Sequence, residues 1–250
     1  MDGATRHGST RDGTGAAVNI GFEIADGASP IRLGRWQDVL SDVECDALIC
    51  DPPYSAKTHD GSDAAVDFKI SGANRKQIGY TPFTPDDVAA FVASWSPRVK
   101  SWMAIMTDDI LGPAWRAAFL EAGRCDFAPV PILQHKCRLS GDGPGSGAVY
   151  LMVARPRQKR FLGWGSLPCW YHSRPEKSLV MGAKPLGLMR AIVRDYSLPG
   201  DLVCDPFVGS GTTAIAALSE GRRFVGSEQK PEHHAIATAR LARGYTPDLF

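Results

Sequence analysis

The chain has 250 residues, of which 44% are hydrophobic and 22% are charged, and its formal net charge is only +1. This length suits one well-buried domain, and the composition excludes both a disordered chain and a wholly basic, histone-like binder. No stretch approaches the roughly 18 uninterrupted apolar residues of a membrane span, so no membrane partner is expected. Six cysteines without a C-x-x-C pair argue against a metal site or a disulfide framework, and they favour reduced thiols in a cytoplasmic protein.

The predicted elements alternate between strand and helix. Residues 1–28, rich in Gly, Ser, Thr and Asp, are expected to form a flexible N-terminal leader without a secretory signal, and 29–250 a single domain. Strands are predicted over the short apolar runs 46–50, 101–106, 148–154, 202–204 and 223–228. Helices are predicted over 85–94, 113–122, 186–196, 212–219 and 231–243. This alternation predicts an α/β fold with a mostly parallel sheet and helices on both faces.

Regular periodicity disappears in the excursion formed by residues 155–182. From Arg155 to Arg194 nine Lys or Arg stand against the single acid Glu176, so this segment carries +8 and the remainder −7. Such asymmetry indicates a face that docks on nucleic-acid phosphates, with a solvated basic loop as the alternative. The candidates for phosphate contact are Arg155, Arg157, Lys159, Arg160 and Arg174. The candidate stacking groups, for which core packing is the alternative, are Trp164, Trp170 and Tyr171.

A glycine-containing turn follows the predicted strand that leads to Asp205. Gly209 and Gly211 allow the backbone to approach a ligand closely, and Glu228 at the end of the next strand is suited to accept hydrogen bonds from ribose hydroxyls. A P-loop would need a lysine that this turn lacks, and a dinucleotide-binding turn would need a third glycine where Ile215 stands. The turn therefore fits S-adenosylmethionine best, with a purely structural turn as the alternative.

A second turn, Asp51-Pro52-Pro53-Tyr54, follows the predicted strand 46–50. Because the two prolines have no backbone donors, their carbonyls are expected to face outward as acceptors beside the Asp51 carboxylate. That array suits an amino group with two N–H donors, and Tyr54 offers an aromatic face to a flipped base. A plain strand-ending turn is the alternative. Both turns follow strand ends, so we expect them on one edge of the sheet.

These two motifs, in this order, resemble the beta group of DNA amino-methyltransferases, in which the motif order is permuted and a target-recognition segment lies between the motifs. The resemblance covers Ile31 to Ala239 and implies a Rossmann-like fold, S-adenosylmethionine as the cofactor and double-stranded DNA as the substrate. It implies that Asp51 and the Pro52 carbonyl bind the target amino group while Tyr54 stacks on the base. The residues that it assigns to the cofactor are Asp205, Phe207, Gly209, Ser210, Gly211, Thr212, Thr213, Glu228, Lys184 and Pro185.

The same resemblance implies in-line methyl transfer without a covalent intermediate, so Cys50 and Cys204 are not expected to act as nucleophiles. Asp at position 51 favours adenine N6 as the methylated atom, and cytosine N4 is the first alternative. An RNA base or a protein amide as the acceptor is the second, and a catalytically silent DNA-binding module is the third. By family analogy, the short recognition segment is compatible with a homodimer, and the compact chain with a solitary or phage-borne bacterial enzyme.

Two further details complete the expectations. Family members often carry Gly-Asp about fifteen residues before the catalytic motif, but here Arg35 follows Gly34, so Trp36 or Asp38 is expected to take over that contact with the cofactor's adenine. His233 and His234 begin a predicted helix and are expected at the surface. The polar loop 59–76 is expected to close over the base.

Overall fold

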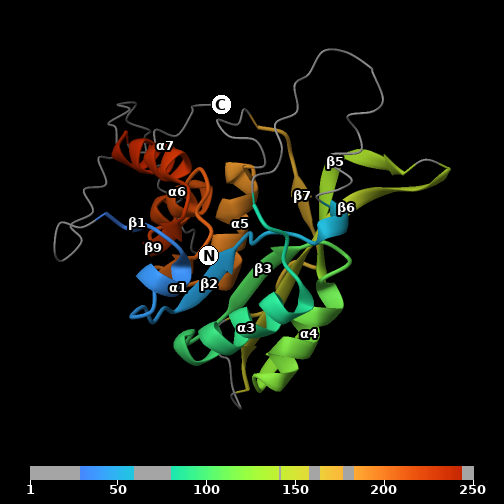
Figure 1. Ribbon diagram of the computed structural model, residues 1–250, viewed down its shortest axis with the longest axis horizontal. Coiled ribbons are helices and arrows are strands. Elements are labelled where there is room, and N and C mark those ends of the chain that lie inside the picture. The colour runs from blue at the N-terminus through green and yellow to red at the C-terminus, as the bar shows by residue number, and fades with distance from the viewer. Residues whose placement is uncertain (1–28, 59–79, 141, 158–163, 177–182, 244–250) are drawn as a thin grey trace, which may run out of the picture.

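A computed structural model describes residues 29–58, 80–140, 142–157, 164–176 and 183–243. The predicted leader 1–28 and the predicted closing loop 59–76 lie outside the described residues. The described residues form a single sheet with helices on both of its faces (Figure 1). In this part of the chain, no helix is long and apolar enough to cross a membrane.

Most of the sheet is parallel. Its strands are β1 (Ile31–Leu33), β2 (Ala47–Cys50), β3 (Met103–Thr107), β4 (Arg124–Asp126), β5 (Val130–Ser140), β6 (Gly143–Pro156), β7 (Tyr171–Ser173), β8 (Leu202–Asp205) and β9 (Arg223–Glu228). Their order is β1-β9-β8-β2-β3-β6-β5-β7, and β4 pairs with the end of β6. The first five strands in this order are parallel, whereas β6 is antiparallel to β3, β4 and β5. Five strands therefore end at one edge, here called the carboxyl edge.

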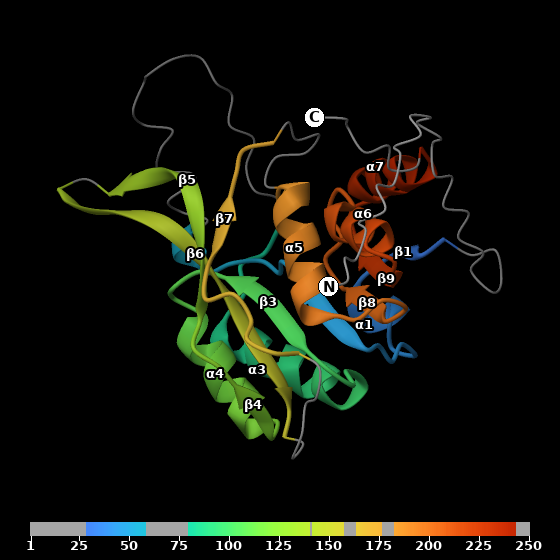
Figure 2. The same cartoon turned by 180° about the vertical axis from the view of Figure 1, so that it is seen from behind.

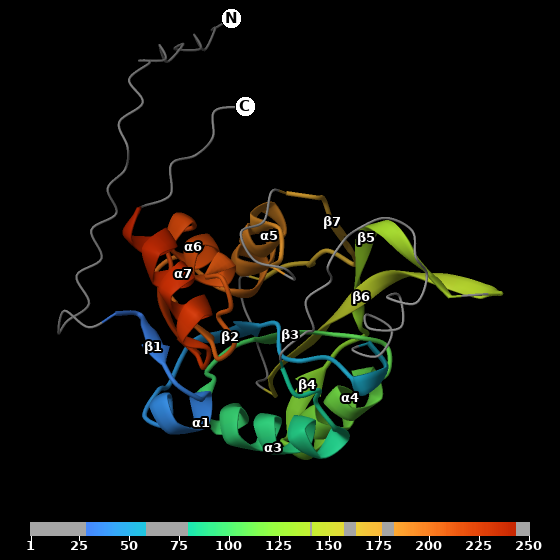
Figure 3. The same ribbon diagram turned by 45° about the horizontal axis from the view of Figure 1, so that its top comes forward.

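The helices cover the sheet in two layers. They are α1 (Trp36–Val39), α3 (Pro85–Trp95), α4 (Gly112–Glu121), α5 (Leu186–Tyr196), α6 (Thr212–Ser219) and α7 (Pro231–Ala242), with the 3-10 turn η2 (Ser96–Arg98) after α3. Figure 3 shows α1, α3 and α4 on one face and α5, α6 and α7 on the other. Successive strand residues alternate between these layers, as in β2, where Ala47 and Ile49 pack toward α5 and α6 while Leu48 and Cys50 pack toward α3 and α4.

Local signals explain where the helices begin. Pro85 opens α3 behind a capping box, in which the Thr84 hydroxyl accepts from the Asp87 N–H and the Asp87 carboxylate accepts from the Thr84 N–H. Gly211 opens α6 with φ +87, a left-handed conformation that favours glycine. All five predicted helices and all five predicted strands are confirmed to within a few residues, apart from β6, which begins earlier than predicted.

The antiparallel part of the sheet was not predicted. β5 and β6 form a hairpin that projects from the body of the protein (Figures 1 and 2). Pairing between β3 and β6 ends at Thr107 and Tyr150, so residues 143–149 extend beyond the carboxyl edge. The predicted excursion also contributes to the sheet, because Tyr171–Ser173 pairs in parallel with β5. β4, β5 and β7 were not predicted as strands, and their pairing reveals them.

Candidate active site

The two motifs meet at the carboxyl edge, as the sequence predicted. β2 and β8 are parallel neighbours in which Leu48 is paired with Cys204, so Asp51 and Asp205 follow adjacent strand ends. Asp205 is buried, and Glu228 ends β9 on the other side of β8. Burial, together with the negative charges of Asp51 and Glu228, raises the pKa of Asp205 to about 7, although hydrogen bonds from Thr213 and Phe207 lower it. The edge thus gathers three carboxyl groups.

Asp51 presents one engaged oxygen and one open oxygen. Its Oδ2 is ion-paired with the Lys184 ammonium, which reaches it from the segment before α5. Its Oδ1 is buried and has no hydrogen-bond partner among the described residues. The same Lys184 Nζ lies 5.2 Å from the centre of the Tyr54 ring. The motif therefore holds a carboxylate whose Oδ2 is bound by a cation that also lies near the Tyr54 ring, while its Oδ1 is an unused acceptor.

The sequence resemblance assigned Lys184 to the cofactor, whereas the structure brings it to Asp51. Pro185 is the N-cap of α5, so the pair stands where the chain enters that helix. Of the rest of the catalytic motif, Pro52 is buried while Pro53 and Tyr54 are half-buried. The Tyr54 carbonyl accepts from the Phe83 N–H at 3.1 Å.

The glycine turn after β8 is tied down at several points. Gly209 and Gly211 both have positive φ, +55 and +87. The Gly209 N–H donates to Glu228 Oε2 at 2.9 Å, and the Asp205 Oδ1 accepts from the Phe207 N–H at 2.8 Å. A Cβ added at Gly211 would lie 3.2 Å from the Ala237 Cβ of α7. The turn is therefore a rigid cradle of backbone groups with two buried acids.

The side chains of this turn are held from α7. Ser210, Thr212 and Thr213 are buried. Arg240 Nη1 donates to the Ser210 carbonyl at 2.6 Å and to its hydroxyl at 3.1 Å. Arg240 was not singled out in the sequence, because an arginine in the last turn of a helix is ordinarily a surface residue.

A second group of residues lies against Glu228 from outside the motifs. The Tyr80 hydroxyl is 2.7 Å from His233 Nδ1, and Lys230 Nζ lies 3.8 Å from the centre of the Tyr80 ring. Burial raises the pKa of Tyr80, and the nearby Glu228 carboxylate raises it further. Tyr80 therefore covers the side of the cradle where Glu228 stands.

The two histidines, which the sequence predicted as surface residues, lie only partly at the surface. His233 and His234 are half-buried, and His234 Nε2 lies 3.0 Å from the Ile31 carbonyl. The first turn of α7 faces β1, so these side chains satisfy neighbouring polar groups. Trp36 is likewise a packing residue, because its ring lies against Phe91 at 5.3 Å between centres.

The predicted phosphate contacts do not form one surface. Arg155 and Arg157 follow the pairing of Ala154 with Met103, the first residue of β3, and so lie at the edge opposite to Asp51. Arg174 is exposed and follows β7, which ends at the carboxyl edge. Lys159 and Arg160 lie outside the described residues. The prediction of a single surface failed because β6 runs antiparallel to β3, so its end, where Arg155 lies, is at the edge opposite to the site.

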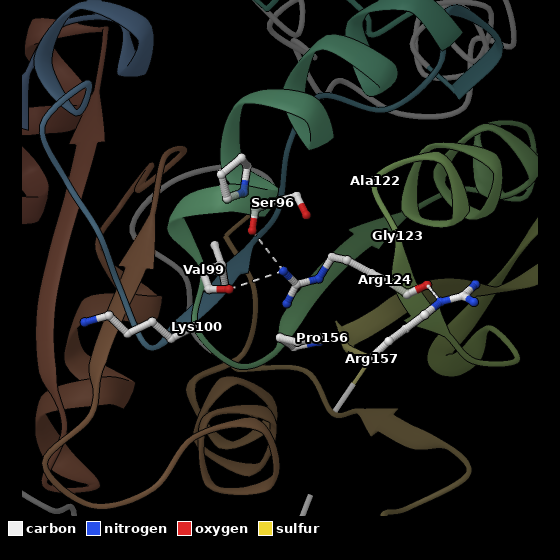
Figure 4. A pocket seen from close by; sticks show the side chains of 9 residues that line it. Ser96, Val99, Lys100, Ala122, Gly123, Arg124, Pro156 and Arg157 are labelled. Carbon is white, nitrogen blue, oxygen red and sulfur yellow. Dashed lines mark hydrogen bonds between the residues drawn. The ribbon is translucent and has the colours of Figure 1, made fainter. Parts of the chain in front are cut away.

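The opposite edge contains an open pocket of about 370 Å³, drawn in Figure 4. Arg124 is 3% exposed and donates to the carbonyls of Ser96 and Val99, at 3.1 and 3.2 Å. Burial lowers the pKa of Arg124 to about 10. The Arg157 guanidinium points away from that of Arg124, and its Nε donates to the Arg124 carbonyl. Arg124 thus holds the carbonyls of the segment that follows α3, and the guanidinium groups of Arg124 and Arg157 do not point into the pocket together.

The comparison with protein families decides the assignment. The DNA methylase family N6_N4_Mtase matches residues 102–239, more than half of the chain. The chain belongs to this family. Its members act on adenine N6 or cytosine N4, and the match does not distinguish the two.

Curated relatives support this membership over parts of their length. The type II methyltransferase M.BglI of Bacillus subtilis is 36% identical over 89 residues, which is 35% of this chain and 26% of the relative. The type II methyltransferase M.XycI of Xanthomonas campestris pv. cyanopsidis is 28% identical over 162 residues, 58% of this chain and 54% of the relative. The methylase described here thus spans about half, or less, of these relatives.

Solved structures share the fold. M1.HpyAVI superposes with a TM-score of 0.61 at 22% identity, covering 88% of this chain and 98% of that one. The cytosine-N4-specific PvuII DNA methyltransferase gives 0.58 at 14% identity, covering 88% and 87%. TTHA0409 of Thermus thermophilus, solved with S-adenosyl-L-methionine, gives 0.55 at 22% identity, covering 87% and 94%. These values confirm the α/β methyltransferase fold of the chain.

Proposed function

We propose that this methylase transfers a methyl group from S-adenosylmethionine to the exocyclic amino group of a flipped DNA base, with N6 of adenine as its target. The observation that carries the proposal is the Asp51 carboxylate, whose buried Oδ1 has no hydrogen-bond partner among the described residues. A buried acceptor without a partner is costly, and it is retained where a ligand supplies the donor. Family membership supports the reaction class.

The residues at the glycine turn fit the cofactor. Glu228 is buried at the end of β9, and its carboxylate accepts from the backbone N–H groups of Gly209 and Lys230. Its remaining lone pairs are suited to accept from ribose hydroxyls. The positive φ of Gly209 and Gly211 opens the backbone for close approach. The carboxyl groups of Asp51, Asp205 and Glu228 suit a ligand with cationic groups. When bound, S-adenosylmethionine supplies the methyl group as an electrophile on its sulfonium.

The protein's part in catalysis is to orient and activate the amino group. Asp51 Oδ1 and the Pro52 carbonyl accept its two N–H donors, which frees the nitrogen lone pair. Lys184 holds the other carboxylate oxygen, so the open one keeps a fixed direction. Tyr54 supplies a stacking face for the base. After methylation the amino nitrogen must lose a proton, and Asp51 Oδ1 is placed to receive it.

Neither strand cysteine suits a covalent route. Cys50 and Cys204 are fully buried, and burial raises the pKa of both thiols well above the ordinary value. A thiol in that state is a weak nucleophile at neutral pH. We therefore retain direct transfer, in which alignment of the reacting atoms supplies most of the acceleration.

We further propose that duplex DNA lies across the carboxyl edge. The β5–β6 hairpin extends past this edge, and its Gln134, His135 and Lys136 are exposed. A two-stranded ribbon fits the major groove of B-DNA. Exposed Arg174 stands on the same side and is suited to phosphate contact. The homodimer stays a prediction.

The assignment to adenine rests on Asp51 and the family resemblance alone. Cytosine N4 is also an exocyclic amino group, so the same acceptors would serve it, and this is the alternative target. An assay that digests the DNA to nucleosides distinguishes the two products by mass.

The test combines product analysis with one variant. Purified protein, incubated with S-adenosylmethionine and DNA, RNA or protein, should methylate DNA and yield N6-methyladenine. Asp51→Ala should abolish methylation and leave cofactor affinity, measured by calorimetry, largely unchanged. Asp126→Ala serves as the control, because Asp126 lies on β4, away from the site, and pairs with Arg116 of α4. Methylation retained by Asp51→Ala would contradict the mechanism, and transfer to RNA or protein instead would contradict the substrate.

A further inference from the structure

A buried carboxylate outside both motifs holds the segment that follows the catalytic turn. Asp108 comes directly after the last residue of β3 and is 5% exposed. Its Oδ2 accepts from the Ser55 N–H at 2.9 Å, the Ser55 hydroxyl at 2.6 Å and the Thr58 hydroxyl at 2.6 Å. Its Oδ1 accepts from the Leu111 N–H at 3.0 Å, at the start of α4. One acid thus joins the catalytic segment to a helix of the core.

These bonds fix the peptide unit between Tyr54 and Ser55 at both of its polar ends. The Tyr54 carbonyl accepts from the Phe83 N–H, and the Ser55 N–H donates to Asp108. The backbone cannot be fixed earlier by donors of its own, because Pro52 and Pro53 have none. Phe83 and Asp108 thus act together as a clamp on the Tyr54–Ser55 peptide. The direction in which the Tyr54 side chain points depends on this clamp.

The acid is held in its charged form. Burial raises the pKa of Asp108, but hydrogen bonds from Ser55, Thr58 and Leu111 outweigh burial and leave it below the ordinary value. Three donors converge on one oxygen, which a carboxylate accommodates. An amide at this place would put either an NH2 group or a weaker neutral acceptor against those donors. The clamp thus requires the carboxylate.

We propose that Asp108 is a positioning residue for methyl transfer, which sets the orientation of Tyr54 and of the adjacent Pro52-Pro53 carbonyls. It touches neither base nor cofactor and acts only through Ser55 and Thr58. The proposal rests on the proposed function, since it assigns the stacking and amino-binding roles to Tyr54 and Pro52. A misplacement of about 1 Å at a reacting group costs about 100-fold in rate, so loosening the clamp should lower kcat strongly.

The test uses Asp108→Asn, with Asp126→Asn as a matched control that loses an ion pair at the opposite edge. In Asp108→Asn, kcat should fall about 10- to 100-fold while the Kd for S-adenosylmethionine, measured by calorimetry, stays that of the wild type. Ser55→Ala should lower kcat less, and adding it to Asp108→Asn should have little further effect, because both changes break the same contact. Asp126→Asn should retain the wild-type kcat.

Hydrogen exchange provides a readout that needs no catalysis. The Ser55 amide should exchange faster in Asp108→Asn than in the wild type or in Asp126→Asn, because an NH2 group or a weaker neutral oxygen replaces its carboxylate acceptor. An unchanged Ser55 exchange rate or an unchanged kcat would overturn the proposal, as would additive losses in the double variant. If the wild type itself does not methylate DNA, the proposed function fails while the exchange result still reports on the clamp.

Discussion

Replacing Asp205 with Asn should stabilise the protein progressively as the pH rises from 4 to 8. The carboxyl group is 1% exposed and stands at the strand end beside Asp51 and Glu228. Its pKa rises from 3.8 to about 7 in the folded protein, chiefly because burial disfavours the charged form. The change to Asn preserves shape and an oxygen that can accept from the Phe207 N–H, so it removes the titration and keeps the hydrogen bond.

The magnitude follows from the linkage between protonation and folding. Below pH 3.8 the acid is neutral in both states, and its contribution to the free energy of unfolding is fully present. Between pH 3.8 and about 7 the unfolded chain ionises while the folded one keeps its proton, so stability falls with rising pH. A pKa difference of about 3 corresponds to about 4 kcal/mol. That is a large part of the roughly 5 to 15 kcal/mol that stabilises a typical domain.

The assay is urea unfolding of the wild type and Asp205→Asn at intervals between pH 4 and 8. The free energy of unfolding of the variant, minus that of the wild type, should increase by about 4 kcal/mol across this range and level off above pH 7. Titrating groups that do not interact with Asp205 act equally on both proteins and cancel in the difference. A difference that stays constant with pH would refute a raised pKa for Asp205.

Two further predictions concern the same edge. Gly226→Ala would place a Cβ 2.5 Å from the Asp205 carbonyl oxygen and should lower the free energy of unfolding, measured in urea titrations, by about 1 to 3 kcal/mol. Gly112→Ala is the control and should change this free energy little, because its Cβ would lie 4.0 Å from the nearest atom. Equal effects of the two substitutions would contradict the packing argument. Lys184→Met leaves the half-buried Asp51 carboxylate without its cation and should slow single-turnover methylation by about 10-fold or more. Lys184→Arg keeps the positive charge and should recover part of the rate. A wild-type rate in Lys184→Met would show that the ion pair has no role.

The clearest difference between prediction and structure lies in the basic segment. Arg155 and Arg157 were predicted to bind phosphates in one segment with Arg174, because the three residues are close in sequence and are all positively charged. β6 runs antiparallel to β3 and ends at the opposite edge, whereas β7 ends at the carboxyl edge. Strand direction is set by pairing partners far along the chain, which an apolar run does not encode.

The local chemistry of the site was determined by the sequence itself. Asp51-Pro52-Pro53-Tyr54 and the Asp205 turn each follow a short apolar strand, and their residue types alone predict outward acceptors and a backbone cradle. The alternation of strands and helices likewise predicts that parallel strands end together, which brings the two turns to one edge. These conclusions depend on neighbours within a few residues, where sequence patterns are informative.

Only the tertiary structure decided how the site is held. Lys184 reaches Asp51 across 133 positions, and Asp108 reaches Ser55 across 53. Neither contact follows from a motif, because a lysine before a helix and an acid after a strand are compatible with many environments. What selects the contacts is the packing of β3 and α5 beside β2, which buries Asp108, half-buries Asp51 and so favours partners for both carboxylates within the protein.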